Sequence, residues 1–455
     1  MQMGPESYKK PTTFERSWRR IKDLYDSLKK VGEDDPRRVM HSLKVGLALA
    51  SISLFCYFQP TDSSFGASAM WAVMTVVVVF EFFVGATIGK GLNRGLATLV
   101  AGALGVGVHH LAGLSGKIGE PVLVGLFVFL QAALTTFVRF FPKVKARYDY
   151  GLIIFILTFS LLAVSGFQTD EILELAHKRL STVLIGASAC VIISIFVCPV
   201  WAGEDLHNLV AGNVEKLANF LEGFGDEYFE SQDGEQVKDK QPVSQDYQKV
   251  LNSESKEETL VNLARWEPGH GQFTYSHPWK RYLKIGTLAR QCAYHIEALN
   301  GYLNSKKSEK PEIRSEIKEI CTKMSLESGK ALKELASAIK TMTRPESSDI
   351  HVANSKAAAE SLQSVLKAGF WRDSNLLEIV PVITVASLLR DVVICTEKLS
   401  ESVHELASLA HFKTSENLQS NLRKNGGGVV INVDGLKQAS PEIENTPAKK
   451  SVQQV

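Results

Sequence analysis

Two runs of branched and aromatic residues decide the fold of this chain: Val76-Val77-Val78-Val79-Phe80 and Ile153-Ile154-Phe155-Ile156-Leu157. In water, residues of this kind favour β-strands. Each run, however, lies inside an apolar stretch that is long enough to cross a hydrocarbon core of about 30 Å as a helix. Because backbone groups inside a bilayer must be paired within their own segment, we predict that both stretches are helical.

Similar apolar stretches lie on either side of these two runs. Six of them follow one another, roughly at residues 41–58, 67–88, 92–112, 121–140, 149–167 and 180–200. The alternative is the buried core of a large soluble helical protein, which six such runs in series disfavour. The sequence therefore predicts an all-α membrane protein with six transmembrane helices, followed by a cytosolic helical domain.

Charge is distributed unevenly along the 455 residues, although the formal net charge is only +2. Residues 39–201 hold 17 charged residues in 163 positions, whereas residues 202–455 hold 66 in 254. A near-neutral chain with 9% aromatic residues is neither a disordered protein nor a strongly nucleic-acid-coating one, so no nucleic-acid partner is expected. We predict four regions: a cytosolic basic segment (1–38), a six-helix transmembrane domain (39–201), a cytosolic helical domain (202–412) and a disordered tail (413–455).

The cytosolic part shows helical rather than strand periodicity. Apolar residues recur at helical spacing over residues 202–229, and similar stripes return at about 279–304, 312–342, 351–369 and 376–411. Residues 231–258 are polar without a period, so we predict a loop there. Gly426-Gly427-Gly428 and Pro441 are typical of an irregular tail.

The loops between the apolar stretches differ in their content of Lys and Arg, which sets the predicted orientation. Ten basic residues precede the first stretch, and the second and fourth connections are also basic. The first connection, residues 59–66, has none. The positive-inside rule therefore places the N-terminus and the C-terminal half in the cytosol. No signal peptide is expected, because a charged region precedes the first apolar run.

Several ionisable residues fall at membrane depth, where their cost suggests a polar pathway or a buried pair. The basic ones are Lys44, Lys90, Arg94, Arg139 and Arg179. Such cations can offset the dehydration of an anion, and Arg can bind a carboxylate through two hydrogen bonds. The alternative is that each side chain extends to a lipid headgroup. Glu81 is the acidic exception, and we expect it to pair with Lys44 or Arg94.

Acidic residues gather in the predicted outer loops. Asp62 lies in the first of these loops, and Asp170 and Glu174 share one helical face just before the last apolar stretch. Carboxylate oxygens suit hard cations, including trivalent ions. A solvated loop helix is the alternative for each residue taken singly.

A segment rich in Trp, Pro, Gly and His connects the helical stripes of the cytosolic part. It contains Trp266, Glu267 and Pro268 and continues to Trp279. It is either a ligand or gate site, or a rigid loop that docks its aromatic rings against the helices, and we favour docking. His270 and His277 lack zinc-motif spacing. No phosphate-binding loop, nucleophile elbow or metalloprotease motif is present, so neither an enzyme nor a resident cofactor is predicted.

Long strings of this sequence resemble the plant aluminium-activated malate transporter family. In the membrane half they are EDDPRR (33–38), HSLKVG (41–46), MWAVMTVVVVFE (70–81), GATIGKGLNRG (85–95), TFVRFFP (136–142), YDYGLIIFILTF (148–159) and CPVWAGED (198–205). In the cytosolic half they are WEPGHGQF (266–273) and HPW (277–279). The resemblance covers roughly residues 30–412.

The resemblance implies an anion channel for malate efflux, built as a homodimer with its pore on the dimer axis. The family's basic pore positions correspond to Lys90, Arg94, Arg139 and Arg179. The outer acidic positions associated with the aluminium response correspond to Asp62, Asp170 and Glu174, so a regulatory aluminium ion is the one metal expected. Plasma membrane is the expected location, with the vacuolar membrane as the alternative.

Two other functions remain open from the sequence. The first is a proton-coupled secondary exporter of organic anions, in which Glu81 or His177 would carry the coupling. The second is a membrane-anchored scaffold whose cytosolic helices are the working part. Neither the preferred anion nor the role of aluminium can be read from these residues.

Overall fold

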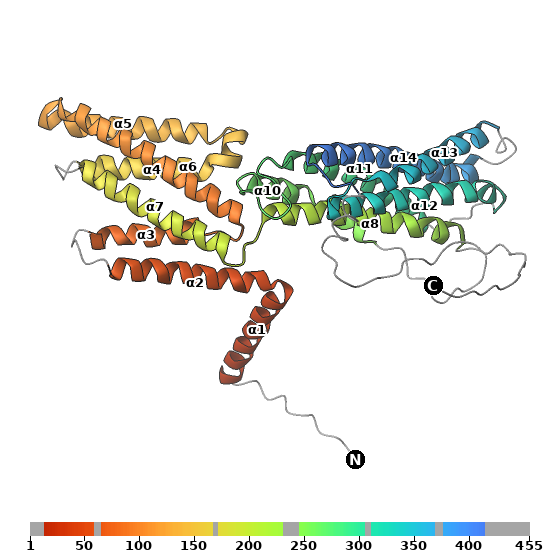
Figure 1. Cartoon of the computed structure of the whole chain (residues 1–455), viewed down its shortest axis with the longest axis horizontal. Coiled ribbons are helices and arrows are strands. Elements are labelled where there is room, and N and C mark those ends of the chain that lie inside the picture. The colour runs from red at the N-terminus through yellow and green to blue at the C-terminus, as the bar shows by residue number, and fades with distance from the viewer. Residues whose placement is uncertain are drawn as a thin grey trace, which may run out of the picture. The chain divides into compact units, whose positions relative to one another are not determined.

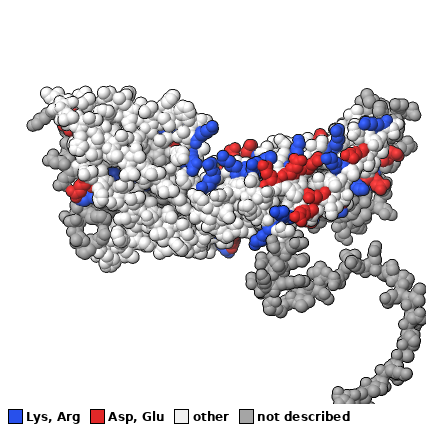
Figure 2. Space-filling view, turned by 45° about the horizontal axis from the view of Figure 1, so that its top comes forward, with Lys and Arg blue, Asp and Glu red and all other residues white. Residues whose placement is uncertain are grey.

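The computed structural model describes residues 13–58, 65–166, 172–230, 245–304, 311–368 and 376–414. In these ranges the chain folds into α-helices joined by short connections and contains no strand, which confirms the predicted all-α class (Figure 1). Charged side chains crowd one part of the surface and are almost absent from another (Figure 2), as the uneven distribution along the sequence predicts.

The first seven helices contain the predicted membrane half. They are α1 (Thr13–Asp34), α2 (Pro36–Tyr57), α3 (Phe65–Val79), α4 (Val84–Gly113), α5 (Gly116–Val138), α6 (Pro142–Gly166) and α7 (Ile172–Phe196). α2 begins where Asp35, in an extended conformation, accepts a hydrogen bond from the backbone N–H of Arg37 and Pro36 occupies the first turn. A proline at this place loses nothing, because its missing N–H has no helical partner.

The predicted second stretch, residues 67–88, is wrong as one continuous helix. α3 ends at Val79, and the backbone leaves the helical path before α4 begins at Val84. The hydroxyl of Thr87 accepts a hydrogen bond from the N–H of Glu81 and donates to its carbonyl oxygen, at 3.0 and 3.2 Å, and so stabilises the break. The apolar run hides this turn because it contains no proline and no glycine before Gly85.

α4 is the central helix of the membrane half, packed by α6 on one side and α7 on the other. Its glycines line these contacts: a Cβ on Gly105 would lie 3.3 Å from Leu162 of α6, and one on Gly91 would lie 3.6 Å from Ala187 of α7. Small residues at helical spacing permit this close packing in lipid. This close packing buries the polar side chains of α4 between that helix and its neighbours.

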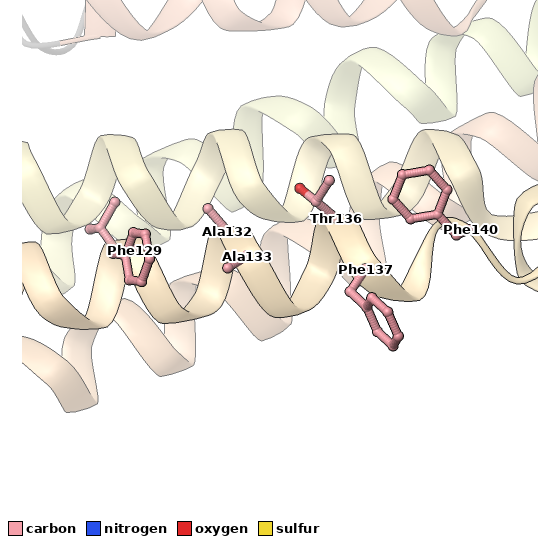
Figure 3. A pocket seen from close by; sticks show the side chains of 7 residues that line it. Phe129, Ala132, Ala133, Thr136, Phe137 and Phe140 are labelled. Atoms are coloured by element: carbon pink, nitrogen blue, oxygen red, sulfur yellow. The ribbon is translucent and has the colours of Figure 1, made fainter.

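α5 has the smallest buried share among the helices long enough to span a membrane, and one of its faces carries an open apolar groove of about 540 Å³ (Figure 3). Ala132 and Ala133 form the floor, and Phe129, Phe137 and Phe140 stand around it. A surface of this composition is suited to lipid chains or to a helix of another subunit.

The C-terminal half begins with α8 (Ala202–Glu230) and continues through the short helices η1 (Gln245–Tyr247), α9 (Gln248–Leu251) and α10 (Glu254–Ala264). The predicted loop over residues 231–258 is therefore wrong from Gln245 onward, and residues 231–244 lie outside the described ranges. α10 escaped prediction because its buried face is short: Glu257, Leu260, Val261 and Ala264.

The long helices of the C-terminal half match the predicted stripes. They are α11 (Trp279–Asn304), α12 (Pro311–Thr341), α13 (Glu346–Ala368) and α14 (Leu376–Leu409). With α8 they enclose one apolar core, in which Leu206, Phe220, Tyr282, Leu332 and Leu399 are fully buried. The last residue of this core is Phe412, and residues 413–455 form a separate unit. The predicted disorder of the tail falls on residues 415–455, which lie outside the described ranges.

Within the described ranges, six helices are long and apolar enough to cross a membrane, and they differ in one place from the predicted six. They include α2, α4, α5, α6 and α7, and then the Ile379–Leu409 part of α14 in place of the shorter α3. α14, however, is half buried within its bundle and carries Glu397 and Glu405, which pair with Lys356 and Lys284 at 2.7 and 3.1 Å. α14 thus packs within the helical bundle, and the crossing of the membrane by α2–α7 stays a prediction.

Candidate functional site

Two buried arginines from different helices lie at the centre of the membrane half. Arg94 of α4 is 5% exposed and Arg179 of α7 is 9% exposed. α4 and α7 pack against each other, and the positive charge of Arg94 disfavours that of Arg179. The carbon of the Arg179 guanidinium lies 4.0 Å from the centre of the Trp71 ring of α3, a cation–π contact.

The hydrogen bonds of Arg94 leave part of its guanidinium free. Its Nη1 donates to the hydroxyl of Tyr150 on α6 at 3.1 Å, while its Nε is buried without a partner among the described residues. No described carboxylate forms an ion pair with Arg94 or Arg179. Two desolvated cations without counter-ions are costly, because each loses its hydration without a compensating charge. The arrangement is therefore suited to binding an anion.

Lys90 extends this cluster along α4. Its Nζ lies 5.5 Å from the centre of the Tyr150 ring, and it forms an ion pair with Glu81. The predicted partners of Glu81, Lys44 and Arg94, are wrong. The break after Val79 turns the Glu81 side chain toward the first turns of α4, so Lys90 is the basic residue within its reach.

Arg139 and Lys44, the other two predicted basic residues, have partners of their own. Arg139 at the end of α5 makes two hydrogen bonds to Asp149 of α6, at 2.7 and 3.2 Å. Lys44 is 1% exposed and its Nζ donates to the carbonyl oxygen of Cys198 at 3.1 Å. That carbonyl follows the end of α7, where the helix dipole favours a positive charge. The structure thus joins Lys90, Arg94 and Arg179 but not these two.

The predicted cation site can be followed at one residue only. Glu174 lies in the first turn of α7, where it forms an ion pair with Lys178. Asp62 and Asp170 lie outside the described residues. Within the described ranges there is no cluster of His, Cys, Asp and Glu that could hold a metal ion. The aluminium site therefore stays a prediction.

The segment that begins at Trp266 lies where the two halves of the chain meet. A Cβ on Gly89 of α4 would lie 3.1 Å from the Trp266 ring, and the Arg147 guanidinium lies 4.8 Å from the centre of that ring. His270 stacks on Trp201 at 3.8 Å, and His277 bonds to the Tyr282 hydroxyl at 3.1 Å. These contacts agree with the docking interpretation, whereas a gating role for Trp266, Glu267 and Pro268 stays a prediction.

Glu267 connects the first turns of two helices. Its carboxylate accepts hydrogen bonds from the N–H groups of Ala202 and Gly203, at 2.6 and 3.0 Å, where α8 begins. The Glu267 side chain also lies close to Gly85 in the first turn of α4, whose backbone N–H favours the charged form of the carboxylate. Burial raises the pKa of Glu267 to about 7, although these N–H donors act in the opposite direction. A group with this pKa changes its charge near neutral pH.

Sequence reasoning missed Tyr150 and Trp71 as members of the basic cluster. Each lies within a string used for the resemblance, but neither is ionisable, so the search for charges at membrane depth passed over them. A polar or amphipathic aromatic residue inside a span is the signal that would have found them.

A multi-pass helical membrane protein with buried, uncompensated arginines belongs to the class of membrane proteins that handle anions. The chain itself belongs to the aluminium-activated malate transporter family, whose model matches residues 29–371 under the description "Aluminium activated malate transporter". This confirms the family resemblance.

Proteins from two plants are similar to this chain over most of their length. Aluminum-activated malate transporter 2 of Arabidopsis thaliana is 57% identical over 400 residues, which are 87% of this chain and 80% of that protein. Aluminum-activated malate transporter 7 of the same plant is 54% identical over 423 residues, 87% and 84% of the two chains. Aluminum-activated malate transporter 1 of Triticum aestivum is 46% identical over 400 residues, 85% and 86% of the two chains.

Proposed function

We propose that this protein is an anion channel that mediates malate efflux across a membrane. The names of its similar proteins support malate as the substrate. The anion moves down its electrochemical gradient, since moving one charge through 100 mV releases about 2.3 kcal/mol. The proposal needs no catalytic reaction and no energy from nucleotide hydrolysis.

The observation that carries the proposal is the pair of buried guanidinium groups. Arg94 and Arg179 come from helices on opposite sides of one packing interface, and each keeps hydrogen-bonding capacity. A permeating carboxylate replaces the hydration that these groups lost on folding, and it leaves again because the Glu81–Lys90 pair keeps the local net charge low. In this scheme Lys90 and Arg139 steer anions toward the site, and Lys44 adds positive potential from its buried position.

The assembly and location follow the family resemblance. The proposed channel is a homodimer with its pore on the dimer axis, and the open face of α5 is a surface that a second subunit could cover. It lies in the plasma membrane with both termini in the cytosol, which agrees with the basic connections between the spans. Extracellular aluminium acts through Asp62, Asp170 and Glu174.

The proposal is tested by whole-cell currents in oocytes that express the wild type, Arg94→Ala or Arg179→Ala. Currents are recorded with malate, nitrate and chloride, each with and without aluminium. Each substitution removes one of two cations that stabilise the bound anion, so we expect malate current to fall about tenfold or more at equal surface expression. Arg94→Lys keeps the charge and should retain part of the current.

Lys143→Ala is the matched control, because Lys143 is an exposed basic residue of the same half of the chain. Its currents should match those of the wild type. Unchanged current and selectivity in both Arg variants would overturn the assignment of the site. Malate flux locked to proton movement at a fixed ratio would instead establish the exporter, and the absence of any flux would favour the scaffold.

A further inference from the structure

The helix α1 (Thr13–Asp34) has an apolar face that nothing in the described chain covers. Its large apolar side chains are Trp18, Ile21, Leu24, Tyr25, Leu28 and Val31, which are 63, 58, 61, 64, 63 and 46% exposed. They recur at intervals of three and four residues, so they share one arc of about 140° on the helix surface. A helix obtains most of its stability from packing such a face, so this one requires a partner.

The charges of α1 are arranged around this face in a definite order. Lys22 and Lys29 flank it next to Trp18, and Arg20 flanks it on the other side. The acidic Asp23, Asp26 and Asp34 lie on the opposite face, together with Lys30. Basic residues at both edges would lie level with lipid phosphates when the apolar face is submerged, while the acids would remain in water.

The connection to α2 brings α1 to the membrane surface. α1 ends at Asp34 and the first span begins at Pro36, so a single residue, Asp35, separates the two helices. Asp35 has φ −150° and ψ 95°, an extended conformation that the following proline favours. The backbone thus changes direction where the first span starts, and α1 cannot continue α2 through the bilayer (Figure 1).

We propose that α1 lies in the interface of the leaflet at which α2 begins, with its apolar face among the acyl chains of the lipids. Such helices bury that face about 5–10 Å into the boundary between headgroups and acyl chains. Trp18 and Tyr25 have the amphipathic rings that occur at this depth. Because bases and acids nearly balance along α1, apolar burial supplies more of the binding than attraction to anionic lipid does.

The test uses the full-length protein reconstituted in vesicles of phosphatidylcholine with about 20% phosphatidylserine. A photoreactive benzoyl-phenylalanine replaces Leu28 in one variant and Asp26 in the matched control, and cross-linked products are identified by mass spectrometry. We expect lipid adducts from position 28 at about five times the yield from position 26, because only position 28 faces the acyl chains. Cross-links from position 28 to a second copy of this chain, or equal yields at both positions, would overturn the proposal.

A second measurement does not depend on either photoreactive variant. The protein has six tryptophans, so the contribution of Trp18 is the difference in fluorescence between the wild type and Trp18→Phe. In vesicles that contain brominated acyl chains, this difference should be quenched several-fold relative to vesicles without bromine. A difference signal that bromine leaves unchanged would place Trp18 in water and contradict the inference.

Discussion

Glu267 shows how much a single residue can contribute at the boundary between the two halves of the chain. It is 4% exposed and lies between the first turns of α4 and α8. The positive ends of two helices favour its charged form, whereas burial disfavours it. The raised pKa of about 7 shows that burial is the larger effect.

The pH dependence of stability follows from that pKa. Between pH 4.5 and 7 the folded protein keeps a proton on Glu267 that the unfolded chain has released, so stability falls as pH rises through this window. Across this window the raised pKa lowers the free energy of unfolding by up to about 3 kcal/mol. Thermal unfolding of the purified protein, followed by tryptophan fluorescence from pH 5 to 8, should show a falling midpoint that Glu267→Gln makes flatter.

Glu327 provides the control for this measurement. Burial opposes its ionisation, but hydrogen bonds from His351, Asn354 and Lys330 prevail and lower its pKa to about 2. The stability that ionised Glu327 gives the folded protein is fully present above the unfolded pKa of 4.5 and is lost only as pH falls toward 2. In the Glu327→Gln protein, the unfolding midpoint should therefore change with pH between 5 and 8 as it does in the wild type. A Glu267→Gln protein with the wild-type slope would show that Glu267 does not titrate there.

The residues of the candidate site were predictable to different degrees. Arg94, Arg179 and Lys90 could be found because a charge at membrane depth is conspicuous in the sequence. The partner of Lys44 could not be found from the sequence. It is a backbone carbonyl after α7, and nothing in the sequence relates it to a lysine 154 residues away. The partner of Glu81 was predicted wrongly, because it depends on a helix break that an unbroken apolar run conceals.

At the scale of elements, α4 and α10 approach each other at a glycine. A Cβ on Gly85 would collide with the carbonyl oxygen of Leu263 and with the Glu267 side chain. Both contacts involve atoms that are fixed, since one is backbone and the other is held by the N–H groups of α8. This position therefore allows only glycine without displacement of α10.

Gly85→Ala should destabilise the protein by about 1–3 kcal/mol, because a close-packed contact has no room for a methyl group. The measurement is the thermal unfolding midpoint at constant pH and detergent. Gly107→Ala is the control, because the same α4 offers open space around a Cβ at Gly107. Alanine has the higher helix propensity, so the midpoint of Gly107→Ala should stay the same or rise slightly. Equal midpoints for the two variants would contradict the close approach.

The elements themselves were largely predictable from periodicity, and their ends were not. The long stripes of α8, α11, α12, α13 and α14 extend over many turns, so the pattern of apolar residues is unambiguous. α10 and the turn at residues 80–83 are too short to show a clear period. α10 packs against α8 and α11, and the hydroxyl of Thr87 stabilises the turn.

At the scale of the whole molecule, the assignment of the six spans decides which regions share one side of the membrane. If α2–α7 cross and α14 does not, the N-terminus and the turn between α12 and α13 lie on the same side. If α14 crosses in place of α3, the two lie on opposite sides. Hydropathy alone permits both arrangements.

An epitope tag inserted after Arg344, in that exposed turn, separates the two arrangements. We expect antibody to reach this tag and an N-terminal tag only after the cells are permeabilised, because both lie on the cytosolic side. A third tag, between α2 and α3, should be reached in intact cells. If the tag after Arg344 and the N-terminal tag differed in accessibility, the result would show that α14 crosses the membrane and α3 does not.

The sheltered position of α14 also has a consequence for how the protein is made. Its helix partners α11, α12 and α13 all precede it in the chain, so they leave the ribosome first. The preceding helices can therefore form an apolar surface for α14 before α14 leaves the ribosome. Packing of α14 onto that surface would compete with its insertion into the membrane by the insertion machinery. Because the other helices of the bundle are synthesised first, the order of synthesis favours packing.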